Sequence, residues 1–287
     1  MTPGTALRLG RVSNLPTIWT NALAGLVLSG AMAEPGATAL LIAGVSLAYA
    51  AGMFLNDAFD AEIDALERPD RPIPAGEVAC ATVFAWGYAM LAASVVVIAA
   101  AGLTAGTGAR AAIAAVTLAV LIIVYDRHHK ANPLGPLVMA SCRVAVYVAA
   151  ALVANAYLGK ALAIGAAMLL CHLIALTYIA KQERPPTFGA LWPIALLAVP
   201  PVHGVLLLAR PVAALPWLAL LVADVLAIGL LRRRAPGDMP RAVMTLIAAI
   251  SLVDALAIAG TGRPGLALIA ACGFPLTLAL QRRVRGT

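Results

Sequence analysis

Three aspartates at positions 57, 60 and 64 are the feature of this sequence that most clearly could do chemistry. They follow an apolar stretch, residues 37–59, that is long enough to cross a bilayer. On an α-helix these three positions fall within about 60° of one another, whereas Glu62 points away. Carboxylates this close repel one another unless a cation lies among them, and Mg²⁺ prefers oxygen ligands completed by water and substrate phosphates. The spacing predicts a Mg²⁺ site at a membrane border, with a solvated helix end as the simpler alternative.

Basic and polar residues cluster after three of the apolar segments. Arg68 and Arg71 lie in the proline-rich stretch 66–76, and guanidinium groups bind phosphate in a planar, two-pronged way. The other two clusters are residues 125–133 and 178–186. Ordinary anchoring of a cytoplasmic loop is the alternative explanation for the arginines. The arginines of the first cluster are therefore suited to bind a phosphorylated group.

The composition requires helices that position these residues in a membrane. The chain has 287 residues, of which 62% are hydrophobic and 11% charged, and its mean hydropathy is +0.94. We therefore expect an all-α, polytopic membrane bundle of nine to ten transmembrane helices, formed by one domain over residues 1–287. The last segment is short and contains Pro275, so a re-entrant segment there remains open. The expected segments are 14–33, 37–59, 78–101, 107–125, 136–157, 160–180, 189–209, 212–231, 241–260 and 265–281.

The distribution of charge predicts the orientation of the bundle. With the N-terminus inside and ten crossings, fifteen of the 20 lysines and arginines fall on the inner side, four on the outer side, and Arg143 within a span. We expect a multi-pass protein of the inner cell membrane, with no removable signal peptide and with both termini and the site cytoplasmic. The net charge of +7 thus reflects topology and predicts no nucleic-acid partner. The four cysteines are widely spaced in apolar segments and predict no metal site.

Residues 56–76 resemble the first signature of the UbiA superfamily of intramembrane prenyltransferases. The pattern is Asn-Asp-x-x-Asp-x-x-x-Asp followed by Arg-Pro-x-Arg-Pro-x-Pro-x-Gly. The opening stretch 7–17, with Asn21 inside the first segment, and the Tyr-x-x-x-x-Lys ending at 125–130 also fit the family. The tenth segment, together with the variants around Lys130 and Lys181, resembles the narrower Ebo-cluster branch, the UbiA-like EboC proteins.

The resemblance implies a helical bundle around a central cavity that opens to lipid. A polyprenyl diphosphate would lie there with its tail in the bilayer and its diphosphate at the cytoplasmic end, bound by Mg²⁺ and basic residues. By position, the metal ligands would be Asp57, Asp60, Asp64 and Glu183. The side chains that would contact the diphosphate are those of Arg11, Asn21, Asn56, Arg68, Arg71, Tyr125, Lys130, Arg143, Lys181 and Arg184. Metal and basic residues would stabilise the leaving diphosphate, and the acceptor would capture the allylic cation.

One departure from the family pattern puts part of this picture in question. Where the family has a second Asp-x-x-x-Asp motif, this chain has Lys181, Glu183 and Arg184. Either Glu183 binds metal while Lys181 replaces a second Mg²⁺, or diphosphate binding is weakened and the protein is not a catalyst. Arg143, an intramembrane arginine, would neutralise the diphosphate, orient a polar acceptor, or simply hold Asp254 or a helix carbonyl.

The sequence therefore predicts an Mg²⁺-dependent prenyltransferase of the membrane. The acceptor would be a small aromatic or hydroxylated molecule, including a cyclitol-like one on the Ebo resemblance. A transporter or flippase for a polar or lipid-linked metabolite, with Arg143, Asp224 and Asp254 along its path, is the main alternative. A catalytically inactive protein of the same fold is the third.

Overall fold

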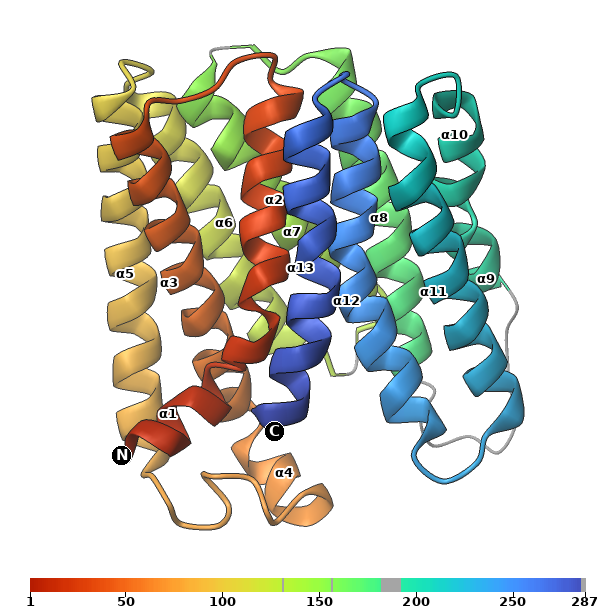
Figure 1. Ribbon diagram of the computed structural model, residues 1–287. Helices are drawn as coiled ribbons and strands as arrows, with labels where there is room; N and C mark the ends of the chain where they lie inside the picture. The colour runs from red at the N-terminus through yellow and green to blue at the C-terminus, as the bar shows by residue number, and fades with distance from the viewer. Residues whose placement is uncertain (131, 156, 182–191, 285–287) are drawn as a thin grey trace.

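The computed structural model of this chain is a bundle of α-helices that run along a common axis (Figure 1). It describes residues 1–130, 132–155, 157–181 and 192–284. In these ranges every regular element is an α-helix or a short 3₁₀ turn, as the composition predicts. The long helices are α3 (Pro35–Phe59), α5 (Cys80–Thr104), α6 (Ala109–His128), α7 (Gly135–Ala154), α8 (Lys160–Lys181), α11 (Ala214–Arg233), α12 (Asp238–Ala259) and α13 (Pro264–Arg283).

In the part of the chain that the structure describes, eight helices are long and apolar enough to cross a membrane, fewer than the nine to ten expected. These lengths and compositions are those of a multi-pass integral membrane protein. The last segment, which the sequence left open, is one of the eight: α13 continues through Pro275 for 20 residues. The first segment contains only α2 (Leu15–Leu28), whose 14 residues rise about 21 Å. The seventh is divided into α9 (Trp192–Leu197) and α10 (Val199–Leu207).

The two short segments end or break at identifiable places. Pro200 and Pro201 have no backbone N–H, so the carbonyls four residues earlier lose their helical donors, and the chain breaks at Ala198. Helix α2 ends at Leu28, before the end of the expected segment 14–33. The 3₁₀ turns are η1 (Val12–Asn14), directly before α2, and η2 (Pro211–Ala213), before α11. Hydropathy detects apolar length but not these interruptions, so the described residues contain fewer single long helices than the segments expected from the sequence.

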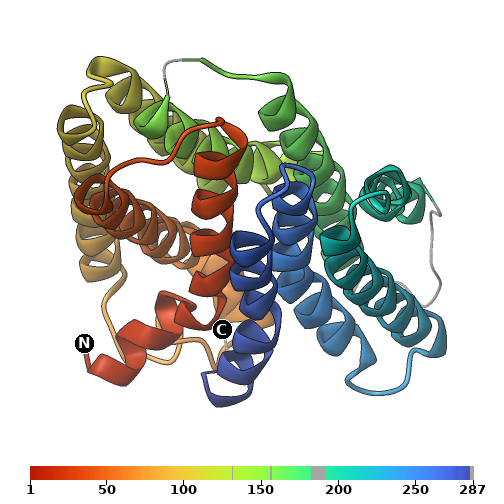
Figure 2. The same ribbon diagram turned by 45° about the horizontal axis from the view of Figure 1, so that its top comes forward.

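Helices α2, α7 and α12 form the centre of the bundle. Buried residues of α2 and α7 belong to both of its large apolar cores, one shared with α3, α5 and α6 and the other with α8 and α11–α13. Gly25 of α2 permits close contact, since a Cβ atom there would lie 2.5 Å from the carbonyl oxygen of Tyr147 in α7. Helices α9, α10 and α11 pack outside α8 and α12 (Figure 2). The centre is therefore a tight seam between two groups of helices.

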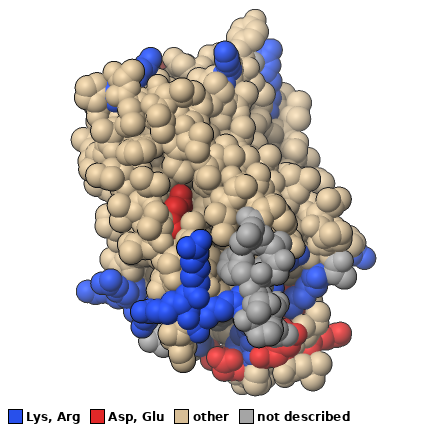
Figure 3. Space-filling view, turned by 90° about the vertical axis from the view of Figure 1, so that its right-hand side faces the viewer, with Lys and Arg blue, Asp and Glu red and all other residues tan. Residues whose placement is uncertain are grey.

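Charged side chains gather at one end of the bundle. The short helices α1 (Pro3–Leu9) and α4 (Ala61–Glu67) cross this end, and α3, α6, α8, α11 and α13 all finish there (Figure 1). Figure 3 shows lysine, arginine and acidic residues concentrated around it, below a broad belt that is almost free of charge. We call it the charged end. The three aspartates and the basic residues singled out by the sequence meet here.

Candidate functional site

The three aspartates flank the junction between α3 and α4. Helix α3 ends at Phe59, and Asp60 links it to α4. Asp57, Asp60 and Asp64 are 2%, 6% and 3% exposed, whereas Glu62 is exposed. The prediction that three carboxylates turn inward while Glu62 points away is thus confirmed by their burial, although the helix is interrupted between them. We call these three residues the carboxylate cluster.

Two arginines from different parts of the chain contact this cluster. Arg11 Nη2 lies 2.7 Å from Asp57 Oδ1, and Arg71 Nη1 lies 2.5 Å from Asp64 Oδ2 and 3.6 Å from Asp57 Oδ1. Arg11 has a left-handed backbone conformation, with φ of 41°, which costs a non-glycine residue free energy. Burial lowers the pKa of the Arg11 guanidinium, but the charge of Asp57 outweighs this effect and raises it. The strain and the charge pairing both fix Arg11 at the cluster.

The segment after α6 provides a third cation. Lys130 Nζ lies 3.3 Å from Asp60 Oδ2 and 3.9 Å from Asp64 Oδ1. His129 Nε2 lies 3.5 Å from Asp60 Oδ2, and its ring stacks on Tyr125. Burial raises the pKa of the Asp60 carboxyl, but the hydrogen bond from His129 and the charge of Lys130 outweigh it, so the pKa is lowered. Asp60 therefore remains ionised, as a ligand for a cation must be.

The proline-rich loop after α4 is held against α1. Thr5 Oγ1 donates to Glu77 Oε2 at 2.8 Å, and Arg8 forms an ion pair with the same carboxylate. This docking brings Arg71 back over the cluster, where its side chain is buried. Arg68 lies at the end of α4 and is exposed, so the two predicted diphosphate-binding arginines have different environments.

The expected second metal motif lies only partly within the described residues. Glu183 and Arg184 fall outside them. Lys181, the last residue of α8, donates from Nζ to the carbonyl oxygens of His129 and Asn132 at 3.2 and 3.3 Å. Lys181 thus holds the segment that carries Lys130, and in this structure its ammonium group is directed to backbone carbonyls.

The carboxylate cluster has the chemistry of an Mg²⁺ site, although its geometry is that of a set of ion pairs. Among the described residues no three acidic, histidine or cysteine side chains are grouped closely enough to hold a metal ion. The cluster nonetheless offers three buried carboxylates, the hard oxygen donors that Mg²⁺ prefers. The residue types of the cluster therefore suit Mg²⁺. For Mg²⁺ and a diphosphate to bind, the basic side chains must turn from the carboxylates to the phosphate oxygens.

Asn21 and Arg143 belong to a second, deeper group of polar residues. Arg143 Nη1 donates to Thr17 Oγ1 and Asn21 Oδ1 at 3.1 and 3.0 Å. Asn21 Nδ2 donates to both carboxylate oxygens of Asp254, and Tyr147 donates to Asp254 Oδ1 at 2.6 Å. We call these five residues the buried network.

The buried network changes the interpretation of two predicted site residues. Both ends of the Asn21 amide are engaged within it, so in this structure Asn21 holds Arg143. Of the three roles left open for Arg143, the structure shows only an indirect link to Asp254 through Asn21, and the other two roles stay predictions. Local sequence could not reveal this, since Asn21 and Asp254 are 233 positions apart.

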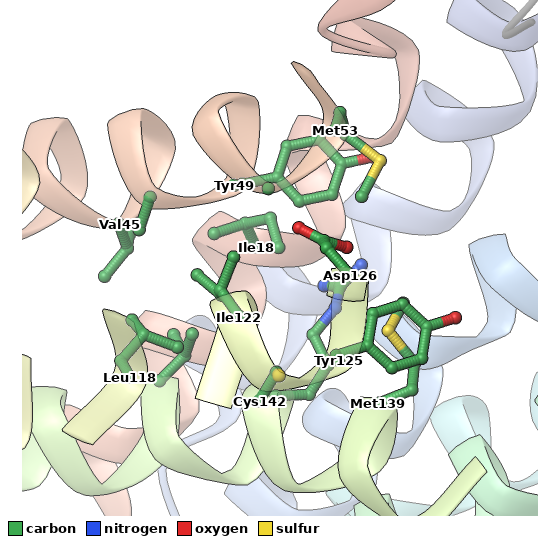
Figure 4. Close-up of a pocket in the computed structure, with 14 residues that line it drawn as sticks. Ile18, Val45, Tyr49, Met53, Leu118, Ile122, Tyr125, Asp126, Met139 and Cys142 are labelled. Carbon is green, nitrogen blue, oxygen red and sulfur yellow. The ribbon is translucent and has the colours of Figure 1, made fainter. Parts of the chain in front are cut away.

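A pocket between α2, α3, α6 and α7 extends inward from the carboxylate cluster. Its lining is mostly apolar, and the polar side chains in it are Tyr49, Tyr125, Asp126 and Arg143. Asp126 projects among Ile18, Tyr49 and Tyr125 (Figure 4). It is 3% exposed, and Asn56 donates to its Oδ1 at 3.4 Å. In the sequence, Asp126 is one residue of the polar cluster 125–133, and the sequence analysis did not single it out.

Solved structures of similar fold are intramembrane prenyltransferase homologues. A structure of a UbiA homologue from Archaeoglobus fulgidus bound to DMAPP and Mg²⁺ superposes with a TM-score of 0.63 over 93% of this chain and 99% of that one, at 16% identity. A digeranylgeranylglyceryl phosphate synthase structure gives 0.60 over 90% of this chain and 97% of that one, at 19% identity. At these identities the likeness shows the all-α UbiA-type fold.

Curated relatives correct the narrower assignment. A digeranylgeranylglyceryl phosphate synthase of Methanoculleus marisnigri is 32% identical over 149 residues, which is 52% of this chain and 51% of that protein. The chain spans about half the length, or less, of the curated relatives that it matches. Their identity does not support the Ebo-cluster branch. That assignment relied on the tenth segment and on the variants around Lys130 and Lys181.

The family profile covers most of the chain. The profile of the UbiA prenyltransferase family matches residues 17–242, which include the carboxylate cluster, the pocket and most of the long helices. The motif at residues 56–76, the fold and this match agree. The chain therefore belongs to the UbiA prenyltransferase family.

Proposed function

We propose that this protein is an Mg²⁺-dependent intramembrane prenyltransferase. It moves a polyprenyl group, of about geranylgeranyl size, from its diphosphate to a hydroxyl-bearing acceptor, and a single membrane domain over residues 1–287 does so. The observation that carries the proposal is the carboxylate cluster with its three cations, placed directly beside an apolar pocket. The donor size comes from the name of the digeranylgeranylglyceryl phosphate synthases, and the use of Mg²⁺ from the homologue structure bound to it.

In this proposal the residues of the charged end bind the diphosphate and stabilise it as it leaves. Asp57, Asp60 and Asp64 would hold Mg²⁺, which supplies positive charge to the diphosphate when bound. Arg11, Arg71 and Lys130 already face the cluster and would turn their N–H groups to phosphate oxygens as negative charge develops.

The pocket supplies the remaining requirements of the reaction. Its apolar walls would keep water from the allylic cation until the acceptor oxygen attacks. Roles for Arg68, Lys181, Glu183 and Arg184 in diphosphate binding remain part of the proposal, with Lys181 acting through the segment that carries Lys130.

A direct assay tests this function. Purified protein is incubated with Mg²⁺, labelled geranylgeranyl diphosphate and geranylgeranylglyceryl phosphate, the acceptor implied by the relatives' name, and the lipids are extracted. The expected result is a labelled product with two geranylgeranyl groups. If diphosphate is neither released nor transferred, the chain is an inactive family member. A transporter would instead move a lipid-linked molecule between leaflets without forming a new bond.

We propose further that the charged end is cytoplasmic. Fifteen of the 20 lysines and arginines lie on the side predicted to be internal, which supports this orientation. In a variant without native cysteines, a cysteine at the exposed Ala75 should react only from the cytoplasm, and one at the exposed Gly36 only from outside. Labelling of both positions from the same side would contradict the topology.

A further inference from the structure

The carboxylate of Asp126 has an unused hydrogen-bonding oxygen inside the pocket. Among the described residues Asp126 Oδ2 has no hydrogen-bond partner, and the atom is buried. The other oxygen has one long contact, 3.4 Å from Asn56 Nδ2. A buried carboxylate oxygen without a partner is costly and is typical of a site that a ligand completes. Asp126 therefore requires a hydrogen-bond donor that enters the pocket.

The polar groups of the pocket indicate the class of that ligand. Asp126 can only accept when ionised, whereas Arg143 can only donate, and both line the same pocket. Arg143 uses Nη1 for Thr17 and Asn21, and in the described part of the chain Nε and Nη2 make no hydrogen bond. A hydroxyl group donates and accepts, so it matches this pair.

Asp126 lies where a bound acceptor could reach the prenyl carbon that carries the diphosphate. Its contact, Asn56, directly precedes Asp57 of the carboxylate cluster. Asp126 is also two residues before the end of α6 at the charged end. It is therefore close to the diphosphate end of the pocket, and Arg143, which lies over the ring of Tyr49, lines the same pocket.

We propose that Asp126 is the residue that binds the nucleophilic hydroxyl of the acceptor and turns its oxygen toward the donor, with Arg143 fixing a second oxygen of a polyol acceptor. This inference rests on the proposed function and deepens it. It assigns to the acceptor site a residue outside the Asp-x-x-x-Asp motifs. In the transfer the bond between acceptor oxygen and donor carbon forms as that carbon's bond to diphosphate breaks, and the hydroxyl proton leaves with the diphosphate.

Steady-state kinetics of Asp126→Asn test the assignment. With geranylgeranyl diphosphate and geranylgeranylglyceryl phosphate as probes, the KM for the acceptor should rise about tenfold or more, while the KM for the donor stays within about twofold. Removing an unpartnered buried charge should leave Tm unchanged or higher. Asp126→Glu retains an accepting carboxylate, so its acceptor KM should lie between those of Asp126→Asn and the wild type.

A matched control is available in α11. Asp224 is 4% exposed, and neither of its carboxylate oxygens has a partner among the described residues, but it does not line this pocket. Asp224→Asn should leave the acceptor KM unchanged. A raised donor KM in Asp126→Asn, or a lowered Tm with both KM values unchanged, would overturn the assignment. Absence of product from the wild-type protein would instead reject the proposed function itself.

Discussion

The carboxylate cluster and the buried network are both groups of charged residues in an apolar protein, but they differ in how their charges are satisfied. In the cluster, three carboxylates share three basic side chains through ion pairs of 2.5 to 3.9 Å at the charged end. In the network, Asp254 accepts three hydrogen bonds from Asn21 and Tyr147 and is fully buried. The cluster can exchange its partners for a ligand, whereas the carboxylate of Asp254 is satisfied within the network. We therefore expect substitutions in the cluster to affect activity, and those in the network to affect stability.

The largest effect is expected in the buried network. Asp254→Ala would leave Arg143 without a nearby acid and would leave the Asn21 amide and Tyr147 hydroxyl without their acceptor. Uncompensated buried charge typically costs about 3–5 kcal/mol. Thermal unfolding in detergent should therefore show a markedly lower Tm. Asp254→Asn keeps a carbonyl acceptor, so its Tm should fall less than that of Asp254→Ala. A wild-type Tm for Asp254→Ala would show that the network does not stabilise the fold.

The next largest effect is expected in the carboxylate cluster, and there it should be on turnover. Asp60→Asn removes a proposed Mg²⁺ ligand, so prenyl transfer should fall about 100-fold or more, which corresponds to about 3 kcal/mol of transition-state stabilisation. Tm should change little, because the cluster is held by exchangeable ion pairs. Glu62→Gln, two residues away and exposed, is the control. Equal loss of activity in both variants would show that burial does not distinguish the metal ligands from other acidic residues at this junction.

A smaller effect is expected at Lys181, which lies next to the cluster but does not contact it. Lys181→Ala removes the hydrogen bonds to His129 and Asn132 that hold the Lys130 segment. Loss of this support, worth about 1 kcal/mol, should raise the donor KM about fivefold with little change in the acceptor KM. An unchanged donor KM would remove Lys181 from the site, and it would leave Glu183 and Arg184 as the remaining candidates of the altered motif.

The cluster was predictable from the sequence because its geometry is local. Asp57, Asp60 and Asp64 lie within two helical turns, so helical periodicity alone indicates a shared face. Their charge identified candidate basic residues for the cluster, but the sequence did not show which basic residue pairs with which aspartate. Arg71 reaches Asp64 only because the loop docks on α1 through Glu77.

The network and the pocket could not be predicted, because their contacts join distant segments. Asn21, Arg143 and Asp254 come from α2, α7 and α12, and no local pattern indicates that these helices meet. Asp126 appears in sequence as one polar residue among several in 125–133, and only the packed structure shows that its oxygen lacks a partner. Similarly, hydropathy does not show that the described part of the seventh segment is divided between α9 and α10.

Binding of geranylgeranyl diphosphate with and without Mg²⁺ tests the central claim most directly. Isothermal titration of the purified protein measures affinity without requiring the acceptor. Wild type and Glu62→Gln should bind the donor in Mg²⁺ and lose about 100-fold in affinity when EDTA removes it, whereas Asp64→Asn should bind weakly in both conditions. Equal affinity of the wild-type protein in Mg²⁺ and in EDTA would contradict the assignment of the carboxylate cluster as the metal and diphosphate site.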